Sequence, residues 1–310
     1  MISVVIPAYN EAEGISRTIK TVSSVLEKEV DQYEIIIVDD GSQDGTSRQV
    51  EEAVKADQRI KLIKLTRNFG KEAALNAGLC YSAGDAVVTM DSDLQHPPEL
   101  IPEMYHLWKT KGIKVVNAVK EVRQQENFLK KIAVNFFYFM MKMLTDTDLT
   151  NQTDFKLMDR TVVERYIELS ENQKFFRGLI PWFGFPSKDI YFSPAHRSSG
   201  SSGWSLIKLF KMGIMAICSF SSIPMQTVTL LGGVMFFASI VMGVQTLFMK
   251  LTGQAVEGFA TVILLLLFEG SVIMISLGII GQYISMIYHE TKRRPRYIVE
   301  NSSDMHKDEN

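Results

Sequence analysis

Two long apolar stretches in the last third of the chain constrain its architecture more than any other feature. Val228–Met249 contains no Asp, Glu, Lys or Arg, and Phe259–Tyr288 contains only Glu269. Each stretch reaches the roughly 20 residues that a helix needs to cross a bilayer. Apolar helices of this length are rare in soluble proteins, so the sequence predicts two membrane-spanning helices. Glu269 is then expected either to meet another protein or helix, or to be protonated and bonded within its own helix.

The residues around these stretches predict how the chain is oriented. A basic run, Lys292–Arg296, follows the second stretch, and positive charge beside a span marks the cytoplasmic side. Two spans return the chain to its starting side, so the sequence predicts a cell-membrane protein whose large N-terminal domain and both termini are cytoplasmic. The expected division is a domain over 1–225, a two-helix membrane region over 226–290, and a basic segment with a polar tail over 291–310.

Two further segments combine aromatic, Met and Lys residues, namely 127–144 and 204–220. This composition is typical of helices that lie in a membrane interface, although a buried helix would also suit the first of them. Because a membrane is already implied, the sequence predicts an interface helix near each segment, with the second leading directly into the first span.

The first 120 residues alternate between strand-like and helix-like runs. Apolar strands separated by helices indicate an α/β fold with a mostly parallel sheet covered on both faces. The net charge of −2 gives no basis for nucleic-acid binding, and two cysteines exclude a disulfide scaffold. The expected strands are Ile2–Ile6, Glu34–Val38, Ile60–Leu65, Ala86–Met90 and Val115–Val119.

Acidic residues follow three of these strands, and ligands of parallel sheets bind at the carboxyl ends of strands. Asp91 and Asp93 flank Ser92, and two carboxylates at this spacing suit Mg²⁺ or Mn²⁺, with Gln95 as a further oxygen ligand. The alternative is that Asp93 only caps the following helix. His96 is expected to be a helix-start residue, because no second His lies nearby to complete a zinc site.

Asp39 and Asp40 follow another strand, where their carboxylates suit ribose hydroxyls and base N–H groups, unless they only form a turn. Lys71 opens a helix, where a phosphate group would also be favoured, although it could equally be a solvated lysine. No Gly-X-Gly-X-X-Gly follows a strand, which argues against NAD, and no Gly-X4-Gly-Lys-Ser/Thr occurs, which excludes a P-loop enzyme.

Four short runs of residues occur in the same order as motifs of the family 2 glycosyltransferases, which the chain resembles. More narrowly, the chain resembles the polyprenyl-phosphate hexosyltransferases, which include bactoprenol glucosyltransferases and dolichol-phosphate mannose synthases. The similarity extends from residue 2 to about 299, and the two C-terminal spans fit the bacterial branch. The runs are Val5–Glu11, Asp39–Ser42, Arg67–Glu72 and Met90–Glu99.

The resemblance implies a nucleotide-sugar-binding Rossmann-like domain of the GT-A type and a set of site residues. It places Asp154 beside the reacting centre as a general base or orienter, together with Asp93. A Lys is common in the family where this chain has Gly203, so other basic residues would replace it. The implied donor-binding residues are Pro7, Tyr9, Glu11, Asp40, Lys71 and Asp91. The implied metal ligands are Asp91, Asp93 and Gln95, and the implied contacts to the acceptor phosphate or diphosphate are Lys120, Arg123, Arg197 and Lys208.

The expected activity is an inverting, metal-dependent transfer of one hexose, from UDP-glucose or a related UDP-hexose, to undecaprenyl phosphate at the cytoplasmic membrane face. The expected partners are the nucleotide sugar, the lipid phosphate and membrane lipid, with a homo-oligomer and a flippase as further candidates. Two alternatives remain open. One is a processive polysaccharide synthase, although the chain lacks the Gln-X-X-Arg-Trp motif and the additional spans of that class. The other is a non-catalytic membrane scaffold for a flippase.

Overall fold

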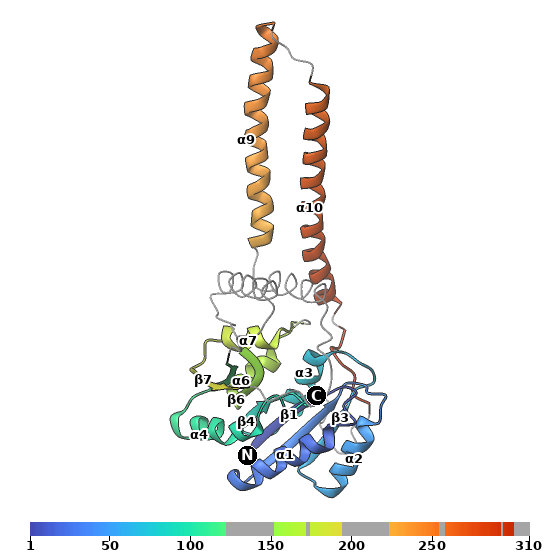
Figure 1. Cartoon of the computed structure of the whole chain (residues 1–310), viewed down its shortest axis with the longest axis vertical. Coiled ribbons are helices and arrows are strands. Elements are labelled where there is room, and N and C mark those ends of the chain that lie inside the picture. The colour runs from blue at the N-terminus through green and yellow to red at the C-terminus, as the bar shows by residue number, and fades with distance from the viewer. Residues whose placement is uncertain (122–151, 172–173, 194–222, 254–257, 293, 301–310) are drawn as a thin grey trace. The chain divides into compact units, whose positions relative to one another are not determined.

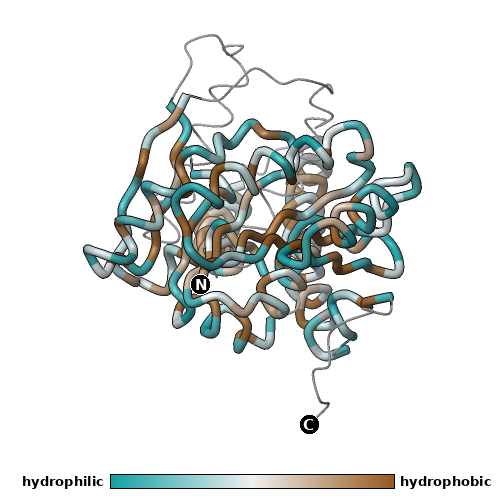
Figure 2. Tube along the Cα trace, turned by 90° about the horizontal axis from the view of Figure 1, so that it is seen from below, coloured by the Kyte–Doolittle hydropathy of each residue, from teal (hydrophilic) through white to brown (hydrophobic). Residues whose placement is uncertain are grey.

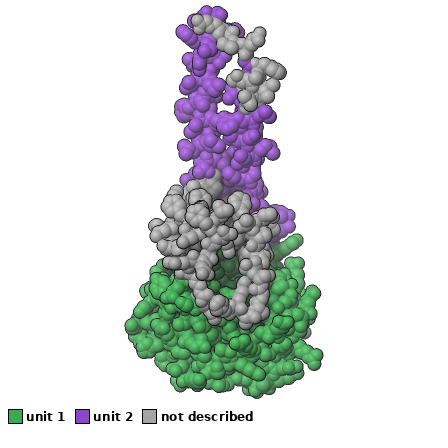
Figure 3. All heavy atoms as spheres, in the orientation of Figure 1, with its two compact units in different colours: residues 1–142, 146–203, 294–310 green, residues 143–145, 204–293 purple. Residues whose placement is uncertain are grey.

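The chain forms two compact units in the computed structural model. The structure describes residues 1–121, 152–171, 174–193, 223–253, 258–292 and 294–300. The first unit contains residues 1–142, 146–203 and 294–310, and the second contains residues 143–145 and 204–293 (Figure 3). The segment after the second apolar stretch therefore belongs to the first unit.

A seven-stranded sheet forms the centre of the first unit, in the strand order β3-β2-β1-β4-β6-β5-β7. All strand pairs are parallel except those of β6, which is antiparallel to both β4 and β5. The strands are β1 Ile2–Ala8, β2 Tyr33–Asp39, β3 Ile60–Lys64, β4 Ala86–Thr89, β5 Val115–Lys120, β6 Gln152–Asp159 and β7 Ser187–Phe192.

Helices cover both faces of this sheet (Figure 1). Neighbouring residues of a strand point to opposite faces. Val4 accordingly packs in the core with Ile15 and Ile19 of α1, while Val5 meets Gly78 of α3. Figure 2 shows brown, hydrophobic segments that run through the middle of the trace. The helices are α1 Ile15–Glu29, α2 Thr46–Ala56, α3 Lys71–Tyr81, the 3-10 helix η1 Pro98–Leu100, α4 Ile101–Lys111, α6 Arg160–Glu168 and α7 Phe176–Trp182.

Gly78 permits the close approach of α3 to the sheet. A Cβ atom at this position would lie 2.2 Å from Cγ1 of Val5. We expect Gly78→Ala to lower the free energy of unfolding by about 1–2 kcal/mol, because overpacking outweighs the higher helix propensity of Ala. Gly14→Ala is the control, since the nearest atom to its new Cβ is 4.0 Å away. Equal thermal unfolding midpoints for the two variants would contradict this packing.

The predicted α/β fold with a mostly parallel sheet is confirmed, and the five expected strands correspond to β1–β5. β6 and β7 were not predicted from the sequence. β6 carries Lys156 at a fully buried position, where Nζ donates to Oδ1 of Asn117 at 2.7 Å and to Oε1 of Gln152 at 3.0 Å. Burial lowers the pKa of Lys156 to about 7. A charged residue inside a strand conceals the apolar pattern by which buried strands are recognised.

The second unit contains two long helices, α9 Ile223–Leu251 and α10 Phe259–Thr291. Their apolar side chains are largely exposed, and both helices are long and apolar enough to cross a membrane. Exposed apolar surface of this extent is not stable in water, so the two helices indicate membrane anchoring. The two expected interface segments, 127–144 and 204–220, lie outside the described residues.

Candidate active site

Three strands bring acidic residues to one edge of the sheet. β2 ends at Asp39 and β4 leads into Asp91, so their carboxyl ends share this edge. β6 is antiparallel to β4, with Lys156 opposite Thr89, and its first residues therefore reach the same edge. The hydroxyl of Thr89 donates to the backbone carbonyl of Asp154, which fixes Asp154 beside the end of β4.

Lys71 links the carboxylates of Asp91 and Asp154. Its Nζ lies 2.5 Å from Oδ1 of Asp91 and 2.7 Å from Oδ2 of Asp154. Burial alone would lower the pKa of Lys71, but the two carboxylates raise that pKa above its ordinary value. The ammonium group therefore remains charged, and 42% of the side chain is exposed to solvent. Lys71 is accessible to an anionic ligand at this edge.

Arg177 of α7 completes the cluster and was not identified in the sequence analysis. Its Nε donates to Oδ1 of Asp154 at 3.0 Å, and its Nη2 donates to Oδ2 at 2.8 Å. This two-point geometry is the strongest that arginine forms with a carboxylate. The only sequence signal is an isolated basic residue in the apolar run Phe175–Phe183. That signal does not reveal a partner 23 residues away.

The surroundings of Asp154 keep its carboxylate ionised. Asp154 is 7% exposed, and burial alone would raise its pKa. Lys71 and Arg177 outweigh that effect and hold the pKa of Asp154 far below its usual range. A carboxylate with such a low pKa is a weak proton acceptor near neutral pH. The arrangement is therefore suited to holding cations in place and poorly suited to removing a proton.

The carboxylate of Glu72 lies near the same cluster and joins α3 to α7 by accepting a hydrogen bond from the backbone N–H of Phe176 at 3.1 Å. Surrounding protein and the Asp154 carboxylate raise the pKa of Glu72 to about 7, although Lys71 and Arg177 oppose this shift. Lys71 and Glu72 are adjacent in sequence, so α3 supplies both a cation and a titratable acid to this edge of the sheet.

Asp40 anchors the loop that precedes α3. Its two carboxylate oxygens accept hydrogen bonds from the backbone N–H groups of Phe69, at 2.7 Å, and Gly70, at 2.8 Å. Burial raises the pKa of Asp40 despite these bonds. Gly41 allows the loop to approach, because a Cβ there would lie 2.4 Å from the carbonyl carbon of Arg67. Asp40 thus shapes the loop, and its contact with a nucleoside remains a prediction.

The other predicted donor-binding residues lie at the end of β1. Pro7 is buried in the strand, whereas Tyr9 is 46% exposed at its end. The backbone N–H of Glu11 donates to Oγ1 of Thr46 at 2.9 Å. Asn10 has a φ of 54°, so the chain turns sharply here and joins the turn that follows β2. Contacts of Pro7, Tyr9 and Glu11 with a donor also remain predictions.

Asp93 and Gln95 follow Asp91 in a tight turn. Oδ1 of Asp93 accepts a hydrogen bond from the backbone N–H of Gln95 at 3.1 Å, and Leu94 has a φ of 54°. The described residues contain no group of three or more His, Cys, Asp or Glu that could hold a metal by themselves. Two carboxylates and one amide nevertheless provide the oxygen ligands that Mg²⁺ and Mn²⁺ prefer, and a bound diphosphate would supply more.

His96 supports this turn from the protein interior. It is 3% exposed, its ring stacks on Phe155 with centroids 5.3 Å apart, and its Nδ1 lies 3.4 Å from the backbone N of Asp91. Burial lowers the pKa of His96 and keeps the ring neutral. A buried, neutral and stacked ring is consistent with the structural role predicted from the sequence.

The predicted acceptor residues are only partly described. Lys120 ends β5 and is half-buried, and desolvation lowers its pKa while Asp91 and Asp93 oppose that shift. These charge interactions place Lys120 within electrostatic reach of the acidic cluster. Arg123, Arg197 and Lys208 lie outside the described residues.

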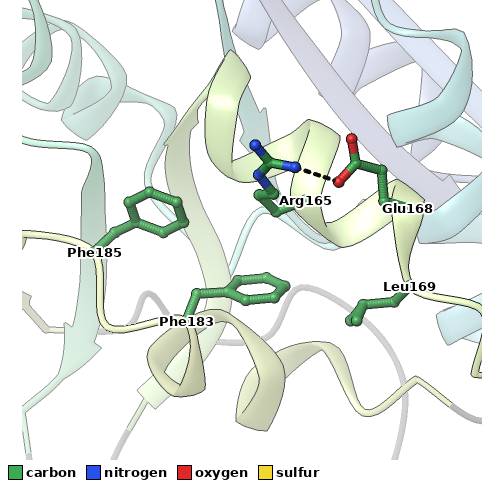
Figure 4. Close-up of a pocket in the computed structure, with 5 residues that line it drawn as sticks. All are labelled: Arg165, Glu168, Leu169, Phe183 and Phe185. Atoms are coloured by element: carbon green, nitrogen blue, oxygen red, sulfur yellow. Dashed lines mark hydrogen bonds and ion pairs between the residues drawn. The ribbon is translucent and has the colours of Figure 1, made fainter.

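A hollow of about 460 Å³ lies between α6 and the segment after α7 (Figure 4). One wall carries the ion pair between Arg165 and Glu168, whose atoms are 2.7 Å apart. The other lining residues are apolar, namely Leu169, Phe183 and Phe185. No residue of the acidic cluster lines this hollow.

Comparisons with known proteins identify the family of this chain. Residues 3–167 match the model of glycosyl transferase family 2. An uncharacterized glycosyltransferase of Synechocystis sp. is 37% identical over 96% of this chain and 94% of its own length. The bactoprenol glucosyl transferase of Shigella phage SfV is 35% identical over 97% of this chain and 98% of its own length.

A solved structure shares the fold of the first unit. It is glucosyl-3-phosphoglycerate synthase from Mycobacterium tuberculosis in complex with Mn²⁺, uridine diphosphate and phosphoglyceric acid. The likeness covers 70% of this chain and 76% of that chain, with a TM-score of 0.50 and 23% sequence identity. The family match and the full-length relatives confirm the resemblance inferred from the sequence motifs, and the chain belongs to glycosyl transferase family 2.

Proposed function

We propose that this glycosyltransferase moves a single hexose from a nucleotide sugar, UDP-glucose or a related UDP-hexose, to undecaprenyl phosphate with inversion at the anomeric carbon. The observation that carries the proposal is the cluster of Asp91, Asp154, Lys71 and Arg177 at the ligand-binding edge of the sheet. The apolar helices α9 and α10 support a lipid acceptor, as do full-length relatives named bactoprenol glucosyl transferase.

In this proposal, Asp91, Asp93 and Gln95 hold Mg²⁺ or Mn²⁺. When bound, the cation would stabilise negative charge on the departing diphosphate. Lys71 contacts Oδ1 of Asp91, so its ammonium group lies beside the proposed cation site, where it would add positive charge next to the diphosphate. The complex of the structural neighbour with Mn²⁺ and uridine diphosphate makes Mn²⁺ the first ion to test.

We assign Asp154 a positioning role. A lipid phosphate is already anionic at neutral pH, so it needs little help from a base to act as a nucleophile. It needs correct placement beside the anomeric carbon, which is worth about 7–11 kcal/mol in well-oriented reactions. Asp154 would provide that placement indirectly, because it fixes the cationic groups of Lys71 and Arg177. Lys120 would add positive charge on the acceptor side, with Arg123, Arg197 and Lys208 as further candidates.

The proposed location is the cytoplasmic face of the cell membrane, with both termini on that side. The basic run that follows α10 supports this orientation. The lipid-linked sugar would then serve as a donor for glycosylation at the cell surface after transfer across the membrane. A homo-oligomer and a flippase partner remain part of the proposal.

A radiolabel partition assay tests the proposed reaction. Purified full-length chain is incubated in detergent with undecaprenyl phosphate and a panel of labelled nucleotide sugars, with Mn²⁺ or with a chelator. We expect label to enter the chloroform phase with at least one UDP-hexose, and the chelator to abolish the transfer. Polymeric product would favour a processive synthase. No lipid product from any nucleotide sugar would favour a non-catalytic scaffold.

A further inference from the structure

The segment after the second apolar helix returns to the catalytic unit. Residues 294–300, here called the C-terminal strap, belong to the first compact unit, although α10 belongs to the second. Only residues 292 and 293 separate the strap from the last residue of α10, Thr291. The strap is therefore a short covalent link between a membrane-type helix and the glycosyltransferase fold.

The strap pairs with the edge strand of the sheet. The backbone N–H of Thr66 donates to the carbonyl of Ile298 at 3.0 Å, and that of Glu300 donates to the carbonyl of Lys64 at 2.8 Å. Leu65 and Val299 form an antiparallel bridge between these bonds. β3 is the outer strand of the sheet and ends at Lys64, so the strap pairs with the last residue of this strand and with the two residues after it.

The first residues of the strap contact the second half of α3. Nη1 of Arg296 lies 3.5 Å from Oδ1 of Asn76, which is 7% exposed. Burial and the neighbouring side chain of Cys80 raise the pKa of Tyr297. Arg296 and Tyr297 are themselves half-buried. These contacts lie between the middle and the C-terminal end of α3, away from the first turn that carries Lys71.

The strap thus holds both ends of one continuous segment of the donor site. Residues 64–66 are held through backbone bonds, and residues 76–80 through side chains. Between them lie the loop bound by Asp40 and the first turn of α3, which presents Lys71 to Asp91 and Asp154. A shift of α3 along its axis would move Lys71 away from both carboxylates.

We propose that the C-terminal strap is a positioning element of the donor site, in which Arg296 and Tyr297 set α3 so that Lys71 meets its two carboxylates. The strap also links the donor-site loop to α10. This inference rests on the proposed function only where it names the donor as a nucleotide sugar.

Two arginines of the basic run provide a matched pair of variants. The pair separates a contact with α3 from an effect on the orientation of the chain in the membrane. Arg294 and Arg296 carry the same charge two residues apart, but Arg294 is exposed whereas Arg296 contacts Asn76. Arg294→Met and Arg296→Met remove equal charge near the membrane helix. A difference between them therefore reports the contact with α3.

The test uses the full-length chain in detergent with UDP and Mn²⁺ as the probe. We expect Arg296→Met to raise the dissociation constant of UDP and the KM of the donor by about five- to tenfold, the effect of losing one typical net hydrogen bond. The kcat should change less than the KM. Arg296→Lys should restore part of the loss, and Arg294→Met should match the unchanged chain.

Hydrogen exchange supplies a readout that needs no ligand. Arg296→Met should increase amide exchange over residues 67–75, whereas Arg294→Met should not. Equal exchange and equal UDP affinity in the two variants would overturn the proposal. So would a lower unfolding midpoint in Arg296→Met with unchanged UDP affinity and KM, because that would show a role in stability alone.

The two proposals can fail separately. If UDP binds and depends on Arg296, but no lipid product forms with any nucleotide sugar, then the strap inference stands and the proposed reaction falls. If lipid product forms and Arg296→Met behaves as Arg294→Met in all measurements, then the reaction stands and the strap inference falls.

Discussion

Asp93→Asn is expected to lower the rate of hexose transfer by about 100- to 1,000-fold, because the cation loses a charged ligand and stabilises the leaving diphosphate less well. Asn is close in size to Asp and preserves an oxygen that can accept the backbone N–H of Gln95, so the turn should still form. Transfer is measured with saturating nucleotide sugar, and Mn²⁺ affinity is measured separately by electron paramagnetic resonance.

Glu99→Gln is the control for Asp93→Asn. Glu99 lies six residues later in η1, is exposed, and loses the same charge in this variant. It should leave both Mn²⁺ affinity and transfer nearly unchanged. Normal transfer by Asp93→Asn at saturating donor, or equal losses in the two variants, would remove Asp93 from the proposed metal site.

Asp154→Asn is expected to lower kcat by about 100-fold, the cost of losing precise placement near the reacting atoms. The neutral amide leaves Lys71 and Arg177 close together without their shared counter-charge. Lys71 and Arg177 are partly exposed and keep some solvation, so losing their hydrogen bonds to the carboxylate should cost about 1–3 kcal/mol and lower the unfolding midpoint as well. Activity is therefore compared at a temperature at which both proteins remain folded.

The pH dependence distinguishes positioning from general base catalysis. The pKa of Asp154 lies far below neutrality because of Lys71 and Arg177, so its carboxylate is ionised throughout the range of about pH 6 to 9. A positioning role predicts that Asp154→Asn lowers kcat by a similar factor at every pH in this range. An acidic limb, along which kcat falls as the pH falls, that is present in the unchanged enzyme and lost in the variant would identify Asp154 as a base.

A double variant separates the two cations. If Asp154 acts mainly by holding Arg177, then adding Arg177→Met to Asp154→Asn should cause little further loss, since both changes remove the same interaction. Independent, additive losses would show that Asp154 and Arg177 act on different steps. Kinetics of the two single variants and the double variant are sufficient for this comparison.

The sequence predicted those parts of the site that depend on a general property of parallel sheets. Asp39, Asp40, Asp91 and Asp93 follow apolar strands, and the carboxyl ends of parallel strands share an edge. The fold class followed from the same strands, and their order along the chain allowed the family motifs to be recognised. Such patterns can be recognised from neighbouring residues alone, without knowing which distant residues come into contact.

Other parts of the site depend on contacts that no local pattern encodes. Arg177 meets Asp154 only because α7 passes beside the start of β6. β6 was missed because Asp154 and Lys156 place charge at buried positions, where the partners come from other elements. The basic residue Arg296 fits a general rule of membrane topology, but its contact with Asn76 arises from the tertiary fold.

Chemical analysis of the lipid product tests whether one hexose is transferred with inversion to the lipid phosphate. Purified full-length chain is incubated with undecaprenyl phosphate, Mn²⁺ and the nucleotide sugar that it accepts, and the extracted lipid is examined by mass spectrometry and nuclear magnetic resonance. We predict that the product is undecaprenyl phosphate carrying one hexose. The hexose should be β-linked when the sugar of the donor is α-linked. A lipid with retained α configuration, a chain of several hexoses, or unmodified undecaprenyl phosphate with every nucleotide sugar would contradict it.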